Sequence, residues 1–144
     1  MDRKTVQRML KMVRDGDDIP APAALLKISA KNASKRLPGF PYSIHENLWH
    51  AVFWQDMWLN AIEGKPNRDW TEDWQSPAES EWPDTKERFL KNIDQAIRLA
   101  GRKELKHSCK TDKRTAELLM NIAVHDAYHL GQITLIKRVL RKQK

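Results

Sequence analysis

Residues 43–64 read SIHENLWHAVFWQDMWLNAIEG, and this stretch decides the fold class. Ser43 is a favoured N-cap residue and Glu46 stands three positions later, so the two predict a capping box at the start of a helix. Gly64 predicts the end of that helix, since glycine commonly follows a helical C-terminus. A helix with so many apolar residues must be covered by several neighbours. Its apolar face consists of Ile44, Leu48, Ala51, Val52, Leu59 and Ile62, widened on one side by Trp54, Met57 and Trp58.

Helical spacing of apolar residues recurs along the rest of the chain, and no alternating stretch indicates a β-strand. The spacing predicts helices over residues 2–14, 83–100 and 113–141, and a helical piece over residues 20–36 that two prolines open. Residues 65–81 lack it and predict a long crossover between helices that need not be antiparallel. We therefore expect an all-α protein, a four-helix bundle with a long crossover between the second and third main helices. The chain of 144 residues is expected to form one domain.

The composition indicates a reducing compartment. The chain has one cysteine, Cys109, so it can form no internal disulfide. The N-terminal residues contain no apolar run typical of a signal peptide, and nothing approaches the roughly 18 apolar residues of a membrane span. We therefore expect a cytoplasmic protein without a membrane partner.

The formal net charge of +7 permits an anionic partner but does not demand one. Cations gather at the C-terminal end of the chain, where they complement the dipole of a helix that ends there. Loose binding to polyanions is the alternative interpretation, and we expect no specific nucleic-acid partner. The cations at this end are Lys137, Arg138, Arg141, Lys142 and Lys144.

Two histidines of the last predicted helix, His125 and His129, lie one turn apart on the same helix face. They fall within the apolar stripe that Leu118, Ile122 and Ile133 define. An imidazole inside a core needs partners for its nitrogens, and one metal ion can satisfy two rings together. Hydrogen-bonded core histidines are the alternative.

A third histidine, His50, sits in the middle of the apolar helix over residues 43–64. We predict that His50, His125 and His129 bind one divalent metal ion. Three neutral ligands leave an open coordination position, as in catalytic metal sites. Imidazole suits zinc, nickel, copper or iron, with zinc or nickel the expected ions. The two other histidines, His45 and His107, are expected to be solvated.

Further polar residues lie near these histidines in the sequence. Gln132, three residues after His129, and Glu46, one turn before His50, are candidates for groups that support the metal ligands or bind substrate. The string HDAYH at 125–129 resembles the H-E-x-x-H pattern of zinc proteases, but Asp126 replaces the glutamate that serves as general base. The expected bundle also lacks the β-sheet that holds peptide in those proteases.

Two segments together carry a family resemblance. Residues 42–55 read YSIHENLWHAVFWQ and residues 124–133 read VHDAYHLGQI. With the lead-in PGFPYS they resemble the DinB/YfiT-like family of metal-dependent proteins, which has one histidine in the second bundle helix and an H-x-x-x-H pair before Gly-Gln in the last. The resemblance implies metal ligands at His50, His125 and His129. A departure is Asp126, where a glutamate is frequent, which puts any acid–base role there in doubt.

The family also implies a four-helix bundle with a long crossover, often as a homodimer. Characterised relatives transfer or isomerise substrates with low-molecular-weight thiols such as bacillithiol, mycothiol or glutathione. We therefore expect a metal-dependent thiol transferase, whose partners are a small-molecule thiol and an electrophile. Trp70, Trp74 and the crossover would wall an apolar electrophile site, and basic residues near the mouth would hold the carboxylates of the thiol.

Two other functions remain open from the sequence. A metal-dependent hydrolase would need a general base, for which Glu46 and Asp126 are the nearby candidates. A non-enzymatic metal-binding or interaction module would use the ion only to stabilise the bundle, or would have lost its activity. We also expect a homodimer, because Trp49 and Phe53 are predicted on the outer flank of an already apolar helix.

Overall fold

The computed structural model describes residues 2–103 and 111–143, and over these ranges the protein is helical without a strand. The helices are α1 (Arg3–Asp15), α2 (Pro22–Leu25), α3 (Ala30–Ala33), α4 (Ile44–Glu63), α5 (Trp82–Gly101) and α6 (Asp112–Lys142), with 3₁₀ turns η1 (Trp70–Glu72) and η2 (Glu79–Glu81). None of the described helices is long and apolar enough to cross a membrane. His107 and Cys109 lie outside the described residues.

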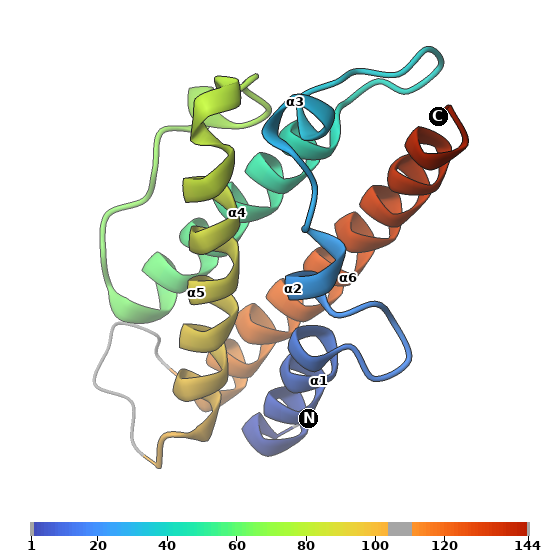
Figure 1. Ribbon diagram of the computed structural model, residues 1–144. Helices are drawn as coiled ribbons and strands as arrows, with labels where there is room; N and C mark the ends of the chain where they lie inside the picture. The colour runs from blue at the N-terminus through green and yellow to red at the C-terminus, as the bar shows by residue number, and fades with distance from the viewer. Residues whose placement is uncertain (1, 104–110, 144) are drawn as a thin grey trace.

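The four long helices pack as a bundle, so the expected all-α fold is confirmed (Figure 1). Helices α1 and α4 each pack against both α5 and α6, which places α1 and α4 on one diagonal. Figure 1 shows α4 and α5 running in the same direction, opposite to α1 and α6. Parallel neighbours cannot be joined by a tight turn, and this explains the long crossover between Glu63 and Trp82.

Helix α4 begins and ends where the sequence predicts. The Ser43 hydroxyl accepts a hydrogen bond from the Glu46 N–H at 3.0 Å, and a Glu46 carboxylate oxygen accepts one from the Ser43 N–H at 3.0 Å. Gly64 closes the helix in the left-handed conformation, with φ of 69°. Because thirteen of the twenty residues in α4 are buried, the helix forms the centre of the bundle.

The helical piece expected over residues 20–36 is wrong as a single helix. It consists of α2 and α3, separated by residues 26–29. Ser29 starts α3 by accepting a hydrogen bond from the Asn32 N–H, and the Ile28 carbonyl accepts one from the Trp82 indole at 2.8 Å. That carbonyl therefore bonds to α5 rather than continuing α2, and local capping together with a tertiary contact overrides the helical spacing.

Ion pairs attach the crossover to the flank of α4 and α5. The Asp56 carboxylate accepts hydrogen bonds from Arg68 of the crossover at 2.8 Å and from Arg88 of α5 at 2.5 Å. The Arg68 guanidinium also lies over the ring of Phe53, 5.0 Å from its centroid. Phe53 is fully buried and the Trp49 indole donates to the Glu72 carbonyl, so the crossover covers the flank that sequence analysis assigned to a dimer contact.

The expectation that His45 is solvated is also wrong, because only 1% of its surface is exposed. The Thr85 hydroxyl donates to the Glu81 carbonyl at 3.0 Å and therefore accepts from the His45 Nε2–H at 2.9 Å. Burial lowers the pKa of His45 to about 4, although the charges of Glu81 and Glu46 act in the opposite direction. The neutral ring of His45 thus links the first turns of α4 and α5 through its hydrogen bond to Thr85.

We predict that His45 destabilises the fold in acid. The pKa is about 6.5 in the unfolded chain and about 4 in the folded one. The unfolded chain therefore binds more protons between these values, so the free energy of unfolding falls as the pH drops from 6.5 to 4. His45→Gln keeps a donor for Thr85, lacks the titrating group and should lessen the loss between pH 7 and pH 4.5 by up to about 2 kcal/mol. Urea denaturation at pH 7 and pH 4.5, with EDTA present, measures the difference, and equal losses in parent and variant would contradict it.

Candidate metal centre

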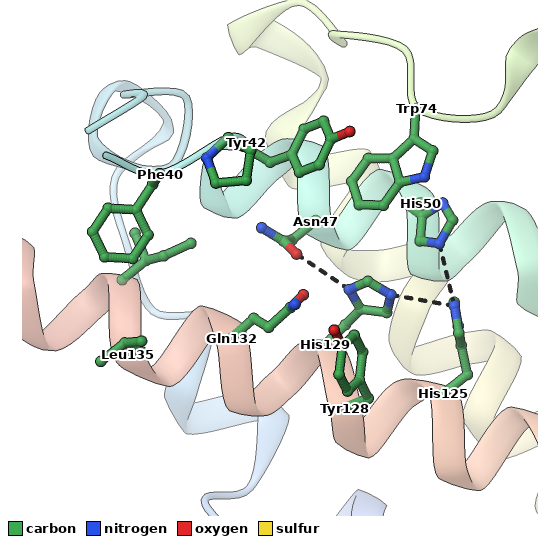
Figure 2. Close-up of a pocket in the computed structure, with 12 residues that line it drawn as sticks. Phe40, Tyr42, Asn47, His50, Trp74, His125, Tyr128, His129, Gln132 and Leu135 are labelled. Carbon is green, nitrogen blue, oxygen red and sulfur yellow. Dashed lines mark hydrogen bonds between the residues drawn. The ribbon is translucent and has the colours of Figure 1, made fainter. Parts of the chain in front are cut away.

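A cavity of about 450 Å³ opens between the first half of α4, the second half of α6 and Trp74 of the crossover. Its walls are mostly aromatic and aliphatic, with amide and imidazole groups at the inner end (Figure 2). The lining residues are Phe40, Pro41, Tyr42, Asn47, His50, Trp74, His125, Tyr128, His129, Gln132, Leu135 and Ile136.

Three imidazoles converge at the inner end of this cavity (Figure 2). His50 comes from α4, while His125 and His129 come from α6. The His125 Nε2 atom lies 3.2 Å from the Nε2 of His50 and 3.2 Å from the Nε2 of His129. The structure thus brings together the three histidines that the sequence selected, each with the same ring nitrogen directed at one point.

The other ring nitrogens of two histidines have fixed partners. His50 Nδ1 lies 2.5 Å from an Asp73 carboxylate oxygen, which can only accept, so Nδ1 carries the proton. The Asn47 NH₂ group donates to the Ser43 carbonyl at 3.0 Å, which directs the Asn47 amide oxygen towards His129 Nδ1 at 3.2 Å. His129 therefore also carries its proton on Nδ1 and presents the lone pair of Nε2.

Facing lone pairs make the cluster fit a cation. His50 and His129 both present unprotonated Nε2 atoms, and a proton on His125 Nε2 can satisfy only one of them. The His125 Nδ1 atom is buried and has no hydrogen-bond partner among the described residues. Two nitrogens bound to one tetrahedral ion at about 2.0–2.1 Å lie roughly 3.3 Å apart, close to the two separations of 3.2 Å found here. The donor set thus fits a divalent transition-metal ion.

Burial keeps all three rings neutral at pH 7. It lowers the pKa of His125 to about 3, with further lowering by His129 and His50. It lowers the pKa of His129 to about 4, and it lowers that of His50 despite the opposing hydrogen bond to Asp73. Neutral imidazole is the form that binds metal, so the ligands need not lose protons at neutral pH.

Sequence reasoning missed Asp73, which holds the crossover against the cluster. Besides His50, its carboxylate accepts hydrogen bonds from the Trp54 indole at 3.1 Å and the Trp74 backbone N–H at 2.9 Å. A carboxylate partner is a common feature of metal-binding histidines. The crossover also contains Asp69 and Glu72, however, and no spacing in the sequence distinguishes Asp73 from them.

The two crossover tryptophans have different places. Trp74 lines the cavity and stacks on His50, with ring centroids 3.8 Å apart and an angle of 13° between the planes. Its other face stacks on Tyr42 at 3.9 Å. Trp70 is 63% exposed, meets Trp54 edge-on and does not line the cavity. Only Trp74 forms the wall that was expected of both.

Of the two supporting residues expected from the sequence, only Gln132 lies in the cavity wall, one turn beyond His129 (Figure 2). Glu46 is turned away from the cavity, and Arg36, Ser76 and the Ser43 N–H bind its carboxylate. Burial alone would raise the pKa of Glu46, but these hydrogen bonds lower it to about 2. It is a structural carboxylate at the start of α4.

Asp126 points into the bundle and is fully buried. Its carboxyl group accepts a hydrogen bond from the Gln55 side chain at 2.8 Å. Burial raises the pKa of Asp126 well above its usual value, although the bond to Gln55 acts against this. Neither Asp126 nor Glu46 lines the cavity, so neither is placed to act there as a general base.

The sequence matches the family model described as the DinB superfamily over residues 21–133. This range includes all three histidines of the cluster, Asn47 and Asp73. Neither the search of curated proteins nor that of solved structures gave a significant match.

We predict that Asp73→Asn weakens binding of zinc by about 10- to 100-fold, since the amide cannot replace the charged partner of His50. Isothermal titration of the EDTA-stripped protein measures the affinity. Glu79→Gln is the control, because it removes an equal charge from an exposed position of the same crossover. Equal affinities in the Asp73 variant and the control would exclude a role for Asp73 in metal binding.

Proposed function

Because the chain belongs to the DinB superfamily, we propose that His50, His125 and His129 hold one divalent metal ion that serves the transfer of a low-molecular-weight thiol to an apolar electrophile. The observation that carries this proposal is the convergence of three Nε2 atoms at the inner end of an open cavity. A metal site that serves only stability is normally closed by a fourth protein ligand. Here the cavity leads from solvent to the imidazoles.

The chain's own residues have separate tasks in this function. Asp73 and Asn47 fix the rings of His50 and His129 so that Nε2 faces the cavity. When bound, a divalent ion with an open position acts as a Lewis acid and lowers the pKa of a thiol, which favours the nucleophilic thiolate. Trp74 shields the cluster from one side, and Gln132 offers an amide that can orient a polar group of the substrate.

The walls of the cavity favour an electrophile with an apolar or aromatic body. Rings of Phe40, Tyr42, Trp74 and Tyr128 form much of the lining. Among the described residues that line it there is no lysine or arginine, so the lining itself offers no cation to the carboxylates of a thiol. A thiol that carries carboxylates would be held there by neutral donors from amide and hydroxyl groups rather than by ion pairs.

Of the two alternatives, the hydrolase is disfavoured. A metal-dependent hydrolase needs a general base, and the two candidates, Glu46 and Asp126, both point away from the cavity. A non-enzymatic metal-binding module remains the second candidate, since the buried histidines alone are compatible with it. In such a module, chelation would lower stability strongly, and thiols would have no affinity for the site.

The first experiment is elemental analysis of the parent and of the triple variant His50→Ala, His125→Ala and His129→Ala. We expect about one equivalent of zinc or nickel per chain in the parent and none in the variant. Single His125→Ala and His129→Ala variants should also lose the metal while remaining helical by circular dichroism. An undiminished metal content in these variants would show that the ion binds elsewhere. A parent that contains no metal even after reconstitution would rule out the metal site.

The second stage tests thiol transfer with the loaded protein. Cobalt substitution gives the site a visible absorption spectrum, and glutathione, mycothiol or bacillithiol should change it if the thiol reaches the ion. Transfer of that thiol to an aromatic electrophile such as a chlorodinitrobenzene is then followed by absorbance. An unchanged cobalt spectrum with every thiol would leave the non-enzymatic metal-binding module as the better proposal.

We propose that the protein forms a homodimer, although the original reason, exposure of Trp49 and Phe53, is wrong. Exposed apolar side chains lie instead along α6, where Val124 is 59% and Leu135 is 55% exposed. Light scattering at tens of micromolar should give twice the chain mass, and Val124→Glu should shift it to one chain mass. Trp70→Glu, on the crossover, is the matched control and should stay dimeric. A monomeric parent would end this proposal.

A further inference from the structure

A second cleft, lined by basic residues, lies between residues 27–32 and the last turns of α6, apart from the histidine cavity. It measures about 370 Å³ and shares no lining residue with the cavity of the metal centre. This size falls within the range of small-molecule sites. Its lining consists of Lys27, Ile28, Ser29, Asn32, Lys137, Leu140 and Arg141.

Three of these residues are cations, and no aspartate or glutamate lies among the described residues of the lining. Within residues 2–103 and 111–143, none of Lys27, Lys137 and Arg141 takes part in an ion pair. Three positive charges around one cleft repel one another, and a bound anion would remove this repulsion. The lining therefore has the charge of an anion site.

Lys137 is held in position rather than extended into solvent. Its ammonium group donates a hydrogen bond of 2.7 Å to the Leu25 carbonyl, across the sequence from α6 to the end of α2. Partial burial lowers the pKa of Lys137, and the neighbouring charge of Arg141 lowers it further. One N–H of the ammonium is thus used for anchoring, and two remain for a ligand.

The helix dipole does not account for this arrangement. It favours cations within about the last turn of a helix, which suits the exposed Arg141 and Lys142. Lys137 lies earlier in α6, is partly buried and bonds to another segment. Lys27 comes from a different part of the chain altogether. The dipole thus accounts for only one of the three cations around the cleft.

We propose that this cleft binds the phosphate group of a small phosphorylated molecule. A phosphate monoester carries a charge between about −1.5 and −2 at pH 7. Three cations are therefore neutralised better by a phosphate monoester than by a single carboxylate. The fork of the Arg141 guanidinium suits two phosphate oxygens, and lysine contributes point charges. The Ser29 oxygen accepts from the Asn32 N–H, so its hydroxyl hydrogen is free to donate to the same group.

The test is a titration with inorganic phosphate and with glycerol 3-phosphate, at constant ionic strength adjusted with sodium chloride, followed by calorimetry or ³¹P NMR. The double variant Lys137→Gln and Arg141→Gln should weaken binding of both by at least tenfold. The matched control is Arg138→Gln and Lys142→Gln, which removes the same charge from exposed positions of the same helix and should stay within about twofold of the parent.

Equal weakening in the two double variants would show diffuse attraction to a basic helix and would overturn the proposal. Absence of saturable phosphate binding in the parent would overturn it too. Lys137 also bonds to Leu25, so its replacement could destabilise the fold. Lys27 is exposed, and Lys27→Gln therefore provides a second variant that should fold normally and bind phosphate clearly more weakly than the parent. His125→Ala should leave phosphate binding unchanged, so this result is independent of the metal centre.

Discussion

The hydrogen bond between Asp73 and His50 joins the two parts of the molecule on which the three-histidine cluster depends. It connects the crossover to the central helix of the bundle at the point where three imidazoles meet. The same carboxylate accepts hydrogen bonds from the Trp54 indole and the Trp74 backbone N–H. Asp73 therefore holds both the His50 ring and the Trp74 indole that stacks on it. Without this bond, the Nδ1–H tautomer of His50 would not be fixed, and Trp74 would not be held over the ring.

Three imidazoles in contact, two of them buried and that of His125 half-buried, are unfavourable for an isolated fold. Each ring has polar nitrogens removed from water, and a buried polar group without a partner lowers stability. Asp73 and Asn47 satisfy one nitrogen of two rings, but the Nε2 atoms face one another. A cation at the point between them would satisfy these atoms, so the geometry of the cluster fits a bound ion.

The sequence predicted features that depend on local rules or on helical spacing. The capping box of Ser43 and Glu46, the end of α4 at Gly64 and the common face of His125 and His129 all follow from contacts within a few residues. The meeting of His50 with His125 and His129 was also expected, but several other features that depend on tertiary contacts were not predicted. The bond of Ile28 to Trp82 interrupts the helix expected over residues 20–36, Thr85 provides the partner that buries His45, and the crossover covers Phe53. Asp73 was missed for the same reason, because its partner is 23 residues away.

The parallel course of α4 and α5 has a consequence for how this site can change. Helix α4 has 20 residues and spans about 30 Å, a distance that about nine extended residues could bridge. Residues 64–81 provide roughly twice that number. The surplus chain forms two short turns and lays Asp73 and Trp74 over the histidines. Substitutions and length changes in this surplus can alter which molecules enter the cavity while the helices keep their positions. Changes in what the cavity admits are thereby separated from changes in the scaffold.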